Sequence, residues 1–238
     1  MKTIHFDNID STNTYLKNNY RFLENMTFVS SDYQSAGKGR NARIWKSEKG
    51  KNLLFSLLLT DDYLIQQYKI ISILTSFCVI KTLEEYDIHN LSIKWPNDVY
   101  VNDKKICGIL LEATSSSKLD CLIVGVGINV NQKEFEGDYL RKPTSMINEL
   151  NKEINIEELK IRLFKTIENN LNNIDDDYYS IIKEYDYLKD KEVYANIDNE
   201  NKKIKVLGIN NDYSLKIEYD NIIRDIEAGE ISFHNEKD

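Results

Sequence analysis

The chain has 238 residues, of which 41% are hydrophobic and 29% charged, a composition typical of a globular protein with a substantial core. Its formal net charge of −8 argues against a general nucleic-acid binder or a membrane-surface protein, because both classes are usually basic. No apolar run reaches the roughly 18 residues that would cross a bilayer, and the first residues lack the apolar core of a signal peptide. We therefore expect a cytoplasmic protein in which Cys78, Cys107 and Cys121 are buried free thiols.

The first predicted element is a helix that Ser11 or Thr12 can cap, with Leu16, Tyr20 and Leu23 at helical spacing. Strands are expected over 27–33 and 52–60, a buried helix over 63–87, and a meander of strands over 91–103, 104–114 and 119–131. An amphipathic helix is predicted over 155–174, and 175–188 extends it or adds another helix.

The pattern changes near Leu188, where short strands separated by polar turns begin, over 191–197, 202–209, 213–219 and 230–233. These strands predict a small C-terminal SH3-like β-barrel, residues 189–238. Strands in residues 1–188 are clustered rather than alternating with helices, which predicts an α+β domain with a mixed, mostly antiparallel sheet flanked by helices.

A glycine-rich loop, "QSAGKGRNAR", covers residues 34–43. Gly37, Gly39 and Ala42 fit the spacing of a dinucleotide-binding fingerprint. That fingerprint requires a helix directly after the loop, whereas a strand is expected here, so we reject this interpretation. A Walker loop is also absent from the sequence.

The same loop concentrates positive charge in an acidic chain, through Lys38, Arg40, Arg43 and Lys46, with Trp45 as a possible anchor. Arginine offers forked donors to phosphate oxygens, and glycine lets backbone N–H groups approach an anion closely. The loop therefore either binds an anionic ligand or is a solvated surface loop, and its residue types leave both interpretations open.

A second polar cluster, "KWPND", interrupts an apolar strand, with Lys94 at its start. Pro96 breaks the strand ladder and holds Trp95, Asn97 and Asp98 in a turn. The cluster is either a functional turn or a turn that is capped by its own Asn and Asp side chains.

Glycines also occur inside the predicted strands, at Gly108, Gly125 and Gly127. A glycine in a strand interior often marks a bulge or the close approach of a ligand. Several of them in one sheet indicate a groove across it, and tight packing of a helix on the sheet is the alternative.

Together, "STN", "YQSAGKGRNARIW", "KWPNDVYVNDKKICGILLE", "VGVGINVN" and "GEIS" have the order and spacing of a biotin–protein ligase. The chain resembles this family, also called biotin–[acetyl-CoA-carboxylase] ligases, over nearly its whole length. The resemblance implies a class II synthetase-like catalytic domain. Two departures are visible: Lys38, Asn41 and Ala42 stand where the usual loop has more arginine and a third glycine. The chain also begins close to "STN", so it resembles the single-function class without a DNA-binding domain.

The family's reaction, as the resemblance implies, has two steps. Biotin and ATP, with Mg²⁺, form biotinyl-5′-AMP and pyrophosphate, and a lysine of a biotin carboxyl carrier protein then attacks the adenylate and releases AMP. We expect no DNA or membrane partner, the metal ligands are not assigned, and a homodimer through the main sheet is left open.

The resemblance also assigns roles to residues. The biotin site comprises Ser11, Thr12, Asn13, Gln34, Gly37, Lys38, Gly39, Arg40, Lys105 and Gly108. The nucleotide site comprises Arg40, Arg43, Trp45, Asn97, Lys105 and Asn129. The catalytic residues are Lys105, Arg40 and Asp98. Lys105 would bridge the biotin carboxylate and the α-phosphate, and Asp98 would orient or deprotonate the carrier lysine unless its role is structural. Residues 36–46 are predicted to be a lid that is mobile without ligand, and Lys38 and Ala42 are its unusual positions.

Three alternative functions fit the sequence less well. A lipoate or octanoate ligase shares the fold, but the sequence lacks a His-Asp motif beside a "GGG"-type loop, and "KWPND" favours biotin. A non-catalytic biotin or nucleotide sensor would not need Lys105 together with a cationic loop. A nucleic-acid-binding module is disfavoured by the net charge of −8.

Overall fold

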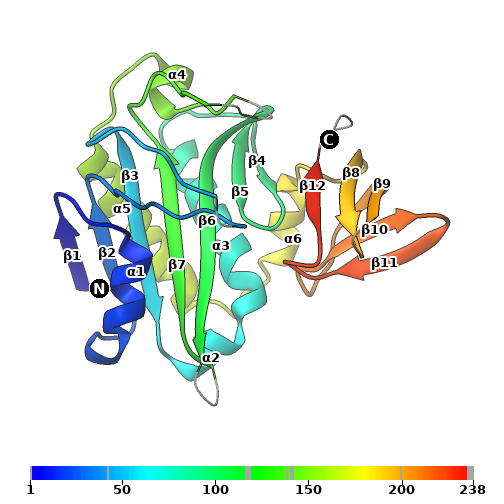
Figure 1. Cartoon of the computed structure of the whole chain (residues 1–238), viewed down its shortest axis with the longest axis horizontal. Helices are drawn as coiled ribbons and strands as arrows, with labels where there is room; N and C mark the ends of the chain where they lie inside the picture. Colours follow the sequence, from blue (N-terminus) through cyan, green and yellow to red (C-terminus); the bar gives the residue numbers. More distant parts are fainter. Residues whose placement is uncertain are drawn as a thin grey trace.

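The computed structural model describes residues 2–41, 43–115, 119–137, 139, 142–198 and 200–234. Its larger part is a seven-stranded sheet with the order β1-β2-β3-β7-β6-β5-β4 (Figure 1). The strands are β1 (Lys2–Phe6), β2 (Thr27–Ser31), β3 (Asn52–Leu59), β4 (Leu91–Lys94), β5 (Asp98–Val101), β6 (Lys104–Ser115) and β7 (Leu119–Asn129). β1 pairs with β2 in parallel and the other neighbours are antiparallel, which confirms the predicted mixed, mostly antiparallel sheet.

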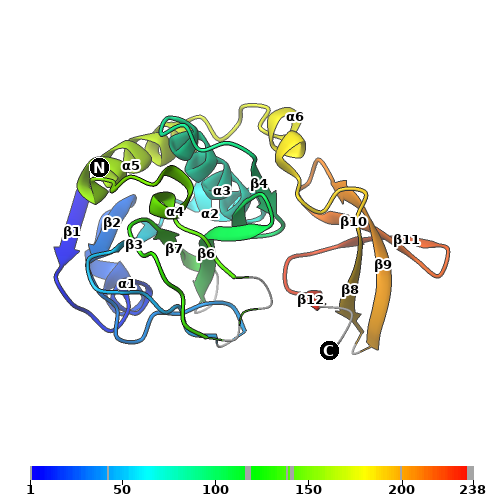
Figure 2. The same ribbon diagram turned by 90° about the horizontal axis from the view of Figure 1, so that it is seen from above.

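Helices cover both faces of this sheet (Figure 2). They are α1 (Thr12–Asn19), α2 (Asp62–Gln66), α3 (Tyr68–Glu84), α4 (Met146–Leu150), α5 (Ile156–Asn172) and α6 (Tyr179–Ile182), with short 3₁₀ turns at Tyr20–Phe22 and Lys183–Tyr185. α3 and α5 lie on one face, whereas α1 packs on β3 and β7 on the other. Ser11 caps α1, because its Oγ accepts the Thr14 N–H at 3.4 Å.

The core is built from apolar residues on both faces of the sheet. Toward α5, the Phe164 ring lies 4.2 Å from the Phe28 ring and 4.8 Å from the Phe55 ring, measured between centroids. Toward α1, Leu16 packs with Val29 of β2. Every residue of β3 is buried, because both of its faces are covered, and this explains its nearly continuous apolar sequence.

Some elements differ from the sequence prediction. The helix expected over 63–87 is divided at Gln67 into α2 and α3. The strand expected over 91–103 is two antiparallel strands, β4 and β5, because the turn that contains Pro96 reverses the chain. The segment 175–188 adds a further helix, one of the two predicted possibilities, but this helix, α6, is short and a 3₁₀ turn follows it. Strand β1 and strand β11 were not predicted.

The C-terminal part is a second, antiparallel sheet with the order β11-β10-β9-β8-β12. Its strands are β8 (Glu192–Ile197), β9 (Glu200–Ile209), β10 (Leu215–Tyr219), β11 (Ile222–Ile226) and β12 (Ser232–His234). This sheet, called here the C-terminal unit, bears out the small β-unit expected in the fold class. Its buried residues belong to the same apolar cluster as the main core. The boundary at residue 188 stays a prediction.

The three cysteines are free and buried, as predicted. Burial raises the pKa of the Cys78 and Cys107 thiols well above the ordinary range, so neither is a reactive thiolate at neutral pH. Among the residues that the structure describes, no helix is long and apolar enough to span a membrane.

Candidate active site

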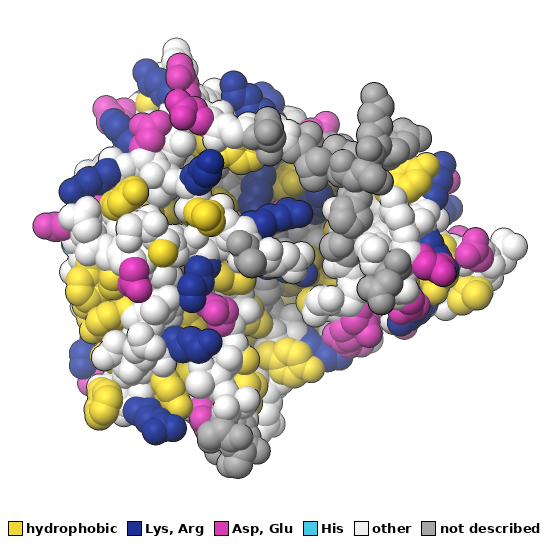
Figure 3. Space-filling model, viewed as in Figure 1, with side chains coloured by type: hydrophobic (Ala, Val, Ile, Leu, Met, Phe, Trp, Pro, Cys, Tyr) yellow, Lys and Arg dark blue, Asp and Glu magenta, His cyan; other side chains and the backbone are white. Residues whose placement is uncertain are grey.

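A cavity of about 710 Å³ lies against the face of the sheet that carries α1. Its walls come from the start of α1, the loop 38–46, the 94–98 turn, strands β6 and β7, and Ile231 and Phe233 of the C-terminal unit. Figure 3 shows Lys and Arg side chains in the hollow at the centre of this face. Residues predicted for the site that line it are Ser11, Thr12, Asn13, Gln34, Lys38, Gly39, Arg40, Arg43, Trp45, Asn97, Asp98, Lys105, Gly108 and Asn129.

One end of the cavity is polar and neutral. The Gln34 Oε1 accepts hydrogen bonds from the Thr12 N–H at 2.7 Å and from the Thr12 hydroxyl at 3.1 Å. The Thr12 hydroxyl also lies 2.6 Å from the Ser56 Oγ. These bonds fix the side chains in one arrangement, so this end presents ordered hydrogen-bonding groups without net charge.

The same network extends through Asn13, whose Oδ1 accepts from the Ser56 hydroxyl at 2.5 Å and whose Nδ2 donates to Glu112 at 2.7 Å. Gly125 is required beneath it, because a Cβ there would lie 2.3 Å from the Asn13 Oδ1. Sequence reasoning missed Ser56 and Glu112. The available signal was a single serine within the apolar run "NLLFSLLL".

The other end of the cavity is cationic and is organised by the 94–98 turn. The Arg40 Nη1 donates to the Asn97 Oδ1 at 2.8 Å, and the Lys105 Nζ lies 2.6 Å from the Asp98 Oδ1. Asn97 is itself fixed, because its Nδ2 donates to the Ile109 carbonyl at 2.7 Å. Two consecutive turn residues thus hold two cations from different segments, so the functional interpretation of "KWPND" gains support.

Burial lowers the pKa of the Arg40 guanidinium, and the nearby Asp98 carboxylate opposes this effect. The pKa of a free arginine is so high that Arg40 remains charged at neutral pH. A partly buried guanidinium that has one hydrogen-bond partner keeps further donors for an anionic ligand.

The loop 37–45 forms a small hairpin over the cavity and is called here the lid. The Gly39 N–H donates to the Arg43 carbonyl at 2.8 Å, and the Trp45 N–H donates to the Gly37 carbonyl at 2.9 Å. Gly37 does not line the cavity. A Cβ at Gly37 would lie 2.7 Å from the Trp45 carbonyl oxygen, so this glycine allows the hairpin to close. Ala42 lies outside the described residues.

The Trp45 indole packs so closely on the sheet that two strand positions beneath it have no room for a Cβ. Gly108 and Gly127 face each other on β6 and β7. A Cβ would lie 2.6 Å from the Trp45 ring at Gly127 and 2.9 Å from it at Gly108. The Lys105 Nζ also lies near this indole, 5.6 Å from the Trp45 ring centroid. The predicted groove is therefore present, but the glycines accommodate lid and α1 side chains.

Asn129 stabilises the backbone of the cationic end through Thr144. Its Nδ2 donates to the Thr144 carbonyl at 2.9 Å, and the Thr144 N–H donates to the Lys105 carbonyl at 2.9 Å. Asn129 is 3% exposed. Its amide group therefore braces the backbone of Lys105, in addition to lining the cavity.

The cavity is positively charged in a negatively charged chain. Its described lining contains Lys38, Arg40, Arg43, Lys46, Lys94 and Lys105, and Asp98 is the one carboxylate among these described residues. Such a local excess of cations favours a ligand with several negative charges.

Comparison with known proteins decides the family. Residues 5–129 match the model of the biotin/lipoate A/B protein ligase family, which is more than half of the chain. The chain belongs to this family. The matched segment holds the neutral end of the cavity, the lid and the cationic end described above.

Relatives and solved structures extend the similarity beyond that segment. The structure of a biotin protein ligase from Aquifex aeolicus in complex with biotin and ATP is 28% identical, covers 98% of this chain and 99% of that one, and has a TM-score of 0.86. The Escherichia coli bifunctional ligase/repressor BirA is 26% identical over 95% of this chain and 72% of that protein. The Bacillus subtilis BirA is 39% identical, but the match spans 45% of this chain and 33% of that protein's length.

A ligase of this family that uses ATP is expected to use Mg²⁺, an ion that prefers oxygen ligands such as carboxylates. Asp98 is the one carboxylate among the described lining residues, and it is paired with Lys105. Mg²⁺ binds through substrate phosphates and water in many sites. The residues present therefore do not form a protein cage for the ion.

Proposed function

We propose that this chain is an ATP-dependent biotin–protein ligase, which forms biotinyl-5′-AMP and transfers the biotinyl group to a lysine of a biotin carboxyl carrier protein. The observation that carries the proposal is the cavity with two chemically different ends. Thr12 and Gln34 offer a neutral hydrogen-bonding end, and Arg40 and Lys105 offer a cationic end. Biotin has a neutral ureido head and an anionic carboxylate, and ATP adds phosphates at the second end.

In the first step, a biotin carboxylate oxygen forms a bond to the α-phosphorus while the bond from that phosphorus to the bridging oxygen of pyrophosphate breaks. Two anions must approach each other, so the step needs local positive charge. In this proposal Lys105 contacts both the carboxylate and the α-phosphate, and Arg40 neutralises phosphate oxygens. Preorganised charges of this kind stabilise developing charge without reorganisation.

In the second step, the amine of the carrier lysine forms a bond to the acyl carbon and AMP leaves. The amine must lose a proton to attack, and Asp98 is the nearby carboxylate. In the structure the Lys105 ammonium lies 2.6 Å from Asp98 Oδ1, so it occupies the position from which a carrier amine would contact this oxygen. We infer that the adenylate draws Lys105 away from Asp98, which leaves the carboxylate available to accept the proton.

ATP–pyrophosphate exchange tests the proposed function directly. Biotin, lipoate and octanoate are each supplied as the acid with ATP and Mg²⁺. Exchange with biotin alone supports the biotin ligase, and exchange with lipoate or octanoate alone assigns the other branch of the family. No exchange with any acid contradicts a ligase.

Lys105→Met separates the chemical role of this residue from its structural one. We expect exchange to fall by ~10²–10³, since one charged donor to the reacting groups is lost. Lys104→Met is the matched control, because Lys104 is exposed and does not line the cavity. Wild-type exchange in Lys105→Met, with a folded protein by circular dichroism, would remove the role assigned to Lys105.

A further inference from the structure

A hydrogen bond joins the C-terminal unit to the 94–98 turn of the cavity, called here the active-site turn. The Nε1–H of Trp95 donates to the carbonyl of Tyr213 at 2.9 Å, although the two residues are 118 positions apart. Trp95 is 2% exposed, so its indole N–H needs a protein partner. Only Pro96 separates Trp95 from Asn97 and Asp98, which hold the cations of the site. Tyr213 lies in the turn 210–214 between β9 and β10.

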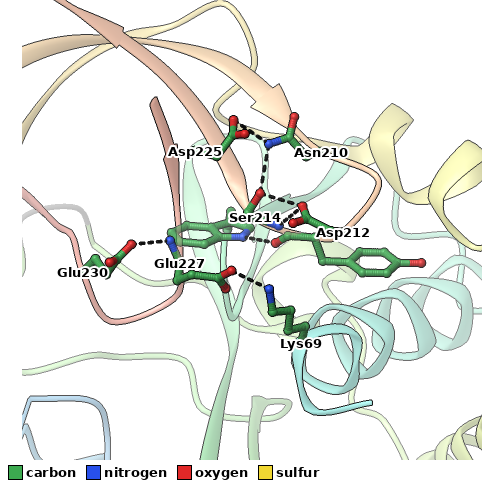
Figure 4. A network of polar contacts seen from close by, with 9 residues as sticks. Lys69, Asn210, Asp212, Ser214, Asp225, Glu227 and Glu230 are labelled. Carbon is green, nitrogen blue, oxygen red and sulfur yellow. Dashed lines mark hydrogen bonds and ion pairs between the residues drawn. The ribbon is translucent and has the colours of Figure 1, made fainter. Parts of the chain in front are cut away.

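The turn 210–214 is itself held by a compact polar network (Figure 4). Asp212 Oδ1 accepts from the Ser214 N–H at 3.1 Å and from the Ser214 hydroxyl at 2.6 Å. The Asn210 Nδ2 donates to Ser214 Oγ at 2.9 Å and to Asp225 at 2.8 Å. These bonds fix the backbone on both sides of Tyr213, and therefore the direction of its carbonyl.

Tyr213 has a left-handed backbone conformation, with φ of 65°. A bulky residue in this region is an outlier, and it persists where the surroundings determine the conformation strongly. Such strained positions are concentrated at functional sites. The left-handed conformation of Tyr213 helps to orient its carbonyl, which accepts the hydrogen bond from Trp95.

A displacement of Trp95 can also displace the cationic groups of the site, because only a few bonds and contacts separate them. Asn97 and Asp98 follow in the same turn and hold Arg40 at 2.8 Å and Lys105 at 2.6 Å. The Asn97 carbonyl also accepts the Ile109 N–H at 2.8 Å, which couples the turn to β6. A displacement of about 1 Å at such groups costs up to ~10² in rate.

We propose that the turn 210–214 of the C-terminal unit is a positioning element for adenylate formation: it holds Trp95, and thereby fixes the turn that places Arg40 and Lys105. This inference rests on the proposed ligase function for the reaction that it serves. Asp212 and Tyr213 act through Trp95 and are positioning residues.

An ion pair between helix α3 and the C-terminal unit provides a control variant for the experiment below. The Lys69 Nζ at the start of α3 lies 2.5 Å from Glu227 Oε1 (Figure 4). Lys69 does not line the cavity and does not contact Trp95 in any hydrogen bond of the described residues. The Lys69 ammonium also interacts electrostatically with the Asp212 carboxylate, but it donates no described hydrogen bond within the turn 210–214. Lys69→Met therefore weakens the attachment of the C-terminal unit while the hydrogen bonds of that turn stay in place.

The test compares Asp212→Ala, Trp95→Phe and Lys69→Met in the full chain. Rate constants for adenylate formation come from single-turnover experiments, normalised to the burst amplitude so that unfolded protein does not count. We expect Asp212→Ala and Trp95→Phe each to slow adenylate formation by about tenfold. The biotin KM should change little, since Thr12 and Gln34 lie at the other end of the cavity. Lys69→Met should stay within about twofold of wild type even if its Tm falls, because merely weaker attachment leaves the normalised rate unchanged.

The double variant Trp95→Phe/Asp212→Ala should be no slower than either single variant, because both act through one path. Rates near wild type in the two single variants, an equal loss in Lys69→Met, or additive losses in the double variant would each overturn the proposal.

Amide hydrogen exchange gives a measurement that does not depend on activity. The Asn97 and Ile109 amides should exchange faster in Asp212→Ala than in Lys69→Met and wild type. If wild type forms no adenylate, the proposed function fails, and these exchange rates still decide whether the turn 210–214 holds the active-site turn. Unchanged exchange in Asp212→Ala would overturn the positioning role.

Discussion

At the scale of single residues, the site depends on glycines that make room for side chains. Gly127 lies under the Trp45 indole, Gly125 under Asn13, and Gly37 beside the Trp45 carbonyl. None of these three positions needs the unusual backbone freedom of glycine, because their φ angles are not in the left-handed region. Their requirement is the absence of a Cβ, so it becomes visible only from what lies opposite them.

Gly127→Ala tests this requirement. The added methyl would overlap the Trp45 ring, so the lid has to shift, at a cost of about 1–3 kcal/mol. We expect adenylate formation to slow about tenfold or more, which a single-turnover assay measures. In a Trp45→Ala background the methyl has room, and Gly127→Ala should then have little further effect. Additive losses in the double variant would show that the two residues do not compete for space.

The surroundings of Asp186, which lies between the 3₁₀ turn Lys183–Tyr185 and the C-terminal unit, also affect its properties. Its two carboxylate oxygens accept the Leu188 N–H at 2.9 Å and the Ile209 N–H at 3.0 Å. Burial nevertheless raises the pKa of Asp186 above its usual value of 3.8, and these backbone hydrogen bonds only reduce the shift.

A raised pKa predicts how stability depends on pH. The folded protein then binds the Asp186 proton more tightly than the unfolded chain, so this contribution is complete below the ordinary pKa and is lost as pH rises through the raised pKa. The stability of wild type relative to Asp186→Asn should therefore be greatest near about pH 3 and decline toward about pH 7. Thermal unfolding of both proteins across this range measures the difference, and a constant or rising difference would contradict the assignment.

At the scale of elements, the lid is a short hairpin closed by three kinds of contact. They are its backbone hydrogen bonds, the Trp45 indole on β6 and β7, and the bond from Arg40 to Asn97. The lid buries little apolar surface besides Trp45, and Ile44 is 71% exposed. Elements with few buried contacts open at low free energy, so a ligand has a large effect on their order.

Limited trypsin digestion tests the lid. Cleavage after Lys38, Arg40 or Arg43 should be fast without ligand and at least several-fold slower with biotin and ATP, because closure protects the adenylate and the loop together. Asn97→Ala should increase cleavage without ligand, since it removes the partner of Arg40. Cleavage within β9 is the internal reference. Equal lid cleavage with and without ligand would count against ordering by ligand.

Prediction from sequence was most accurate for elements with a strong period or a continuous apolar run. Strand β3 and helix α5 are examples. The sequence of β3 is almost continuously apolar, and the buried residues of α5 recur at helical spacing. Strand β1 was missed, since its short sequence "KTIHF" is half exposed at the sheet edge and its partner β2 lies beyond α1. The division of 63–87 at Gln67 was missed because the apolar pattern continues through it.

At the scale of the whole molecule, the charge distribution is uneven. The chain carries −8 overall, while six cations and one carboxylate are found among the described residues that line the cavity. An acidic surface repels ATP, so binding relies on this local field. Fields of partly exposed charges are screened within about 10 Å at ~0.1 M salt.

Salt dependence follows from this distribution. Raising the ionic strength from about 0.05 to about 0.5 M should weaken ATP binding several-fold, because Lys38, Arg43 and Lys46 are partly exposed. Biotin binding, which also uses neutral groups at Thr12 and Gln34, should change less. Isothermal titration calorimetry with each ligand measures both effects, with Lys104→Met as a variant whose salt dependence should equal that of wild type. An equal salt effect on both ligands would contradict this account.

The sequence by itself determined the chemistry of the site, because the residue types that carry it stand in short motifs: cationic and glycine residues in the lid, Asn97 and Asp98 beside Pro96, and Lys105 in β6. Tertiary structure alone decided which groups meet. The pairs Arg40–Asn97, Asn13–Ser56 and Trp95–Tyr213 are separated by 57, 43 and 118 positions. Contacts at such separations depend on strand register and on how the C-terminal unit packs, which no local pattern encodes. For this reason the lid was predictable as a cationic loop. The packing of its Trp45 side chain on two strand glycines, and the hydrogen bond from Trp95 to the Tyr213 carbonyl, were not predictable.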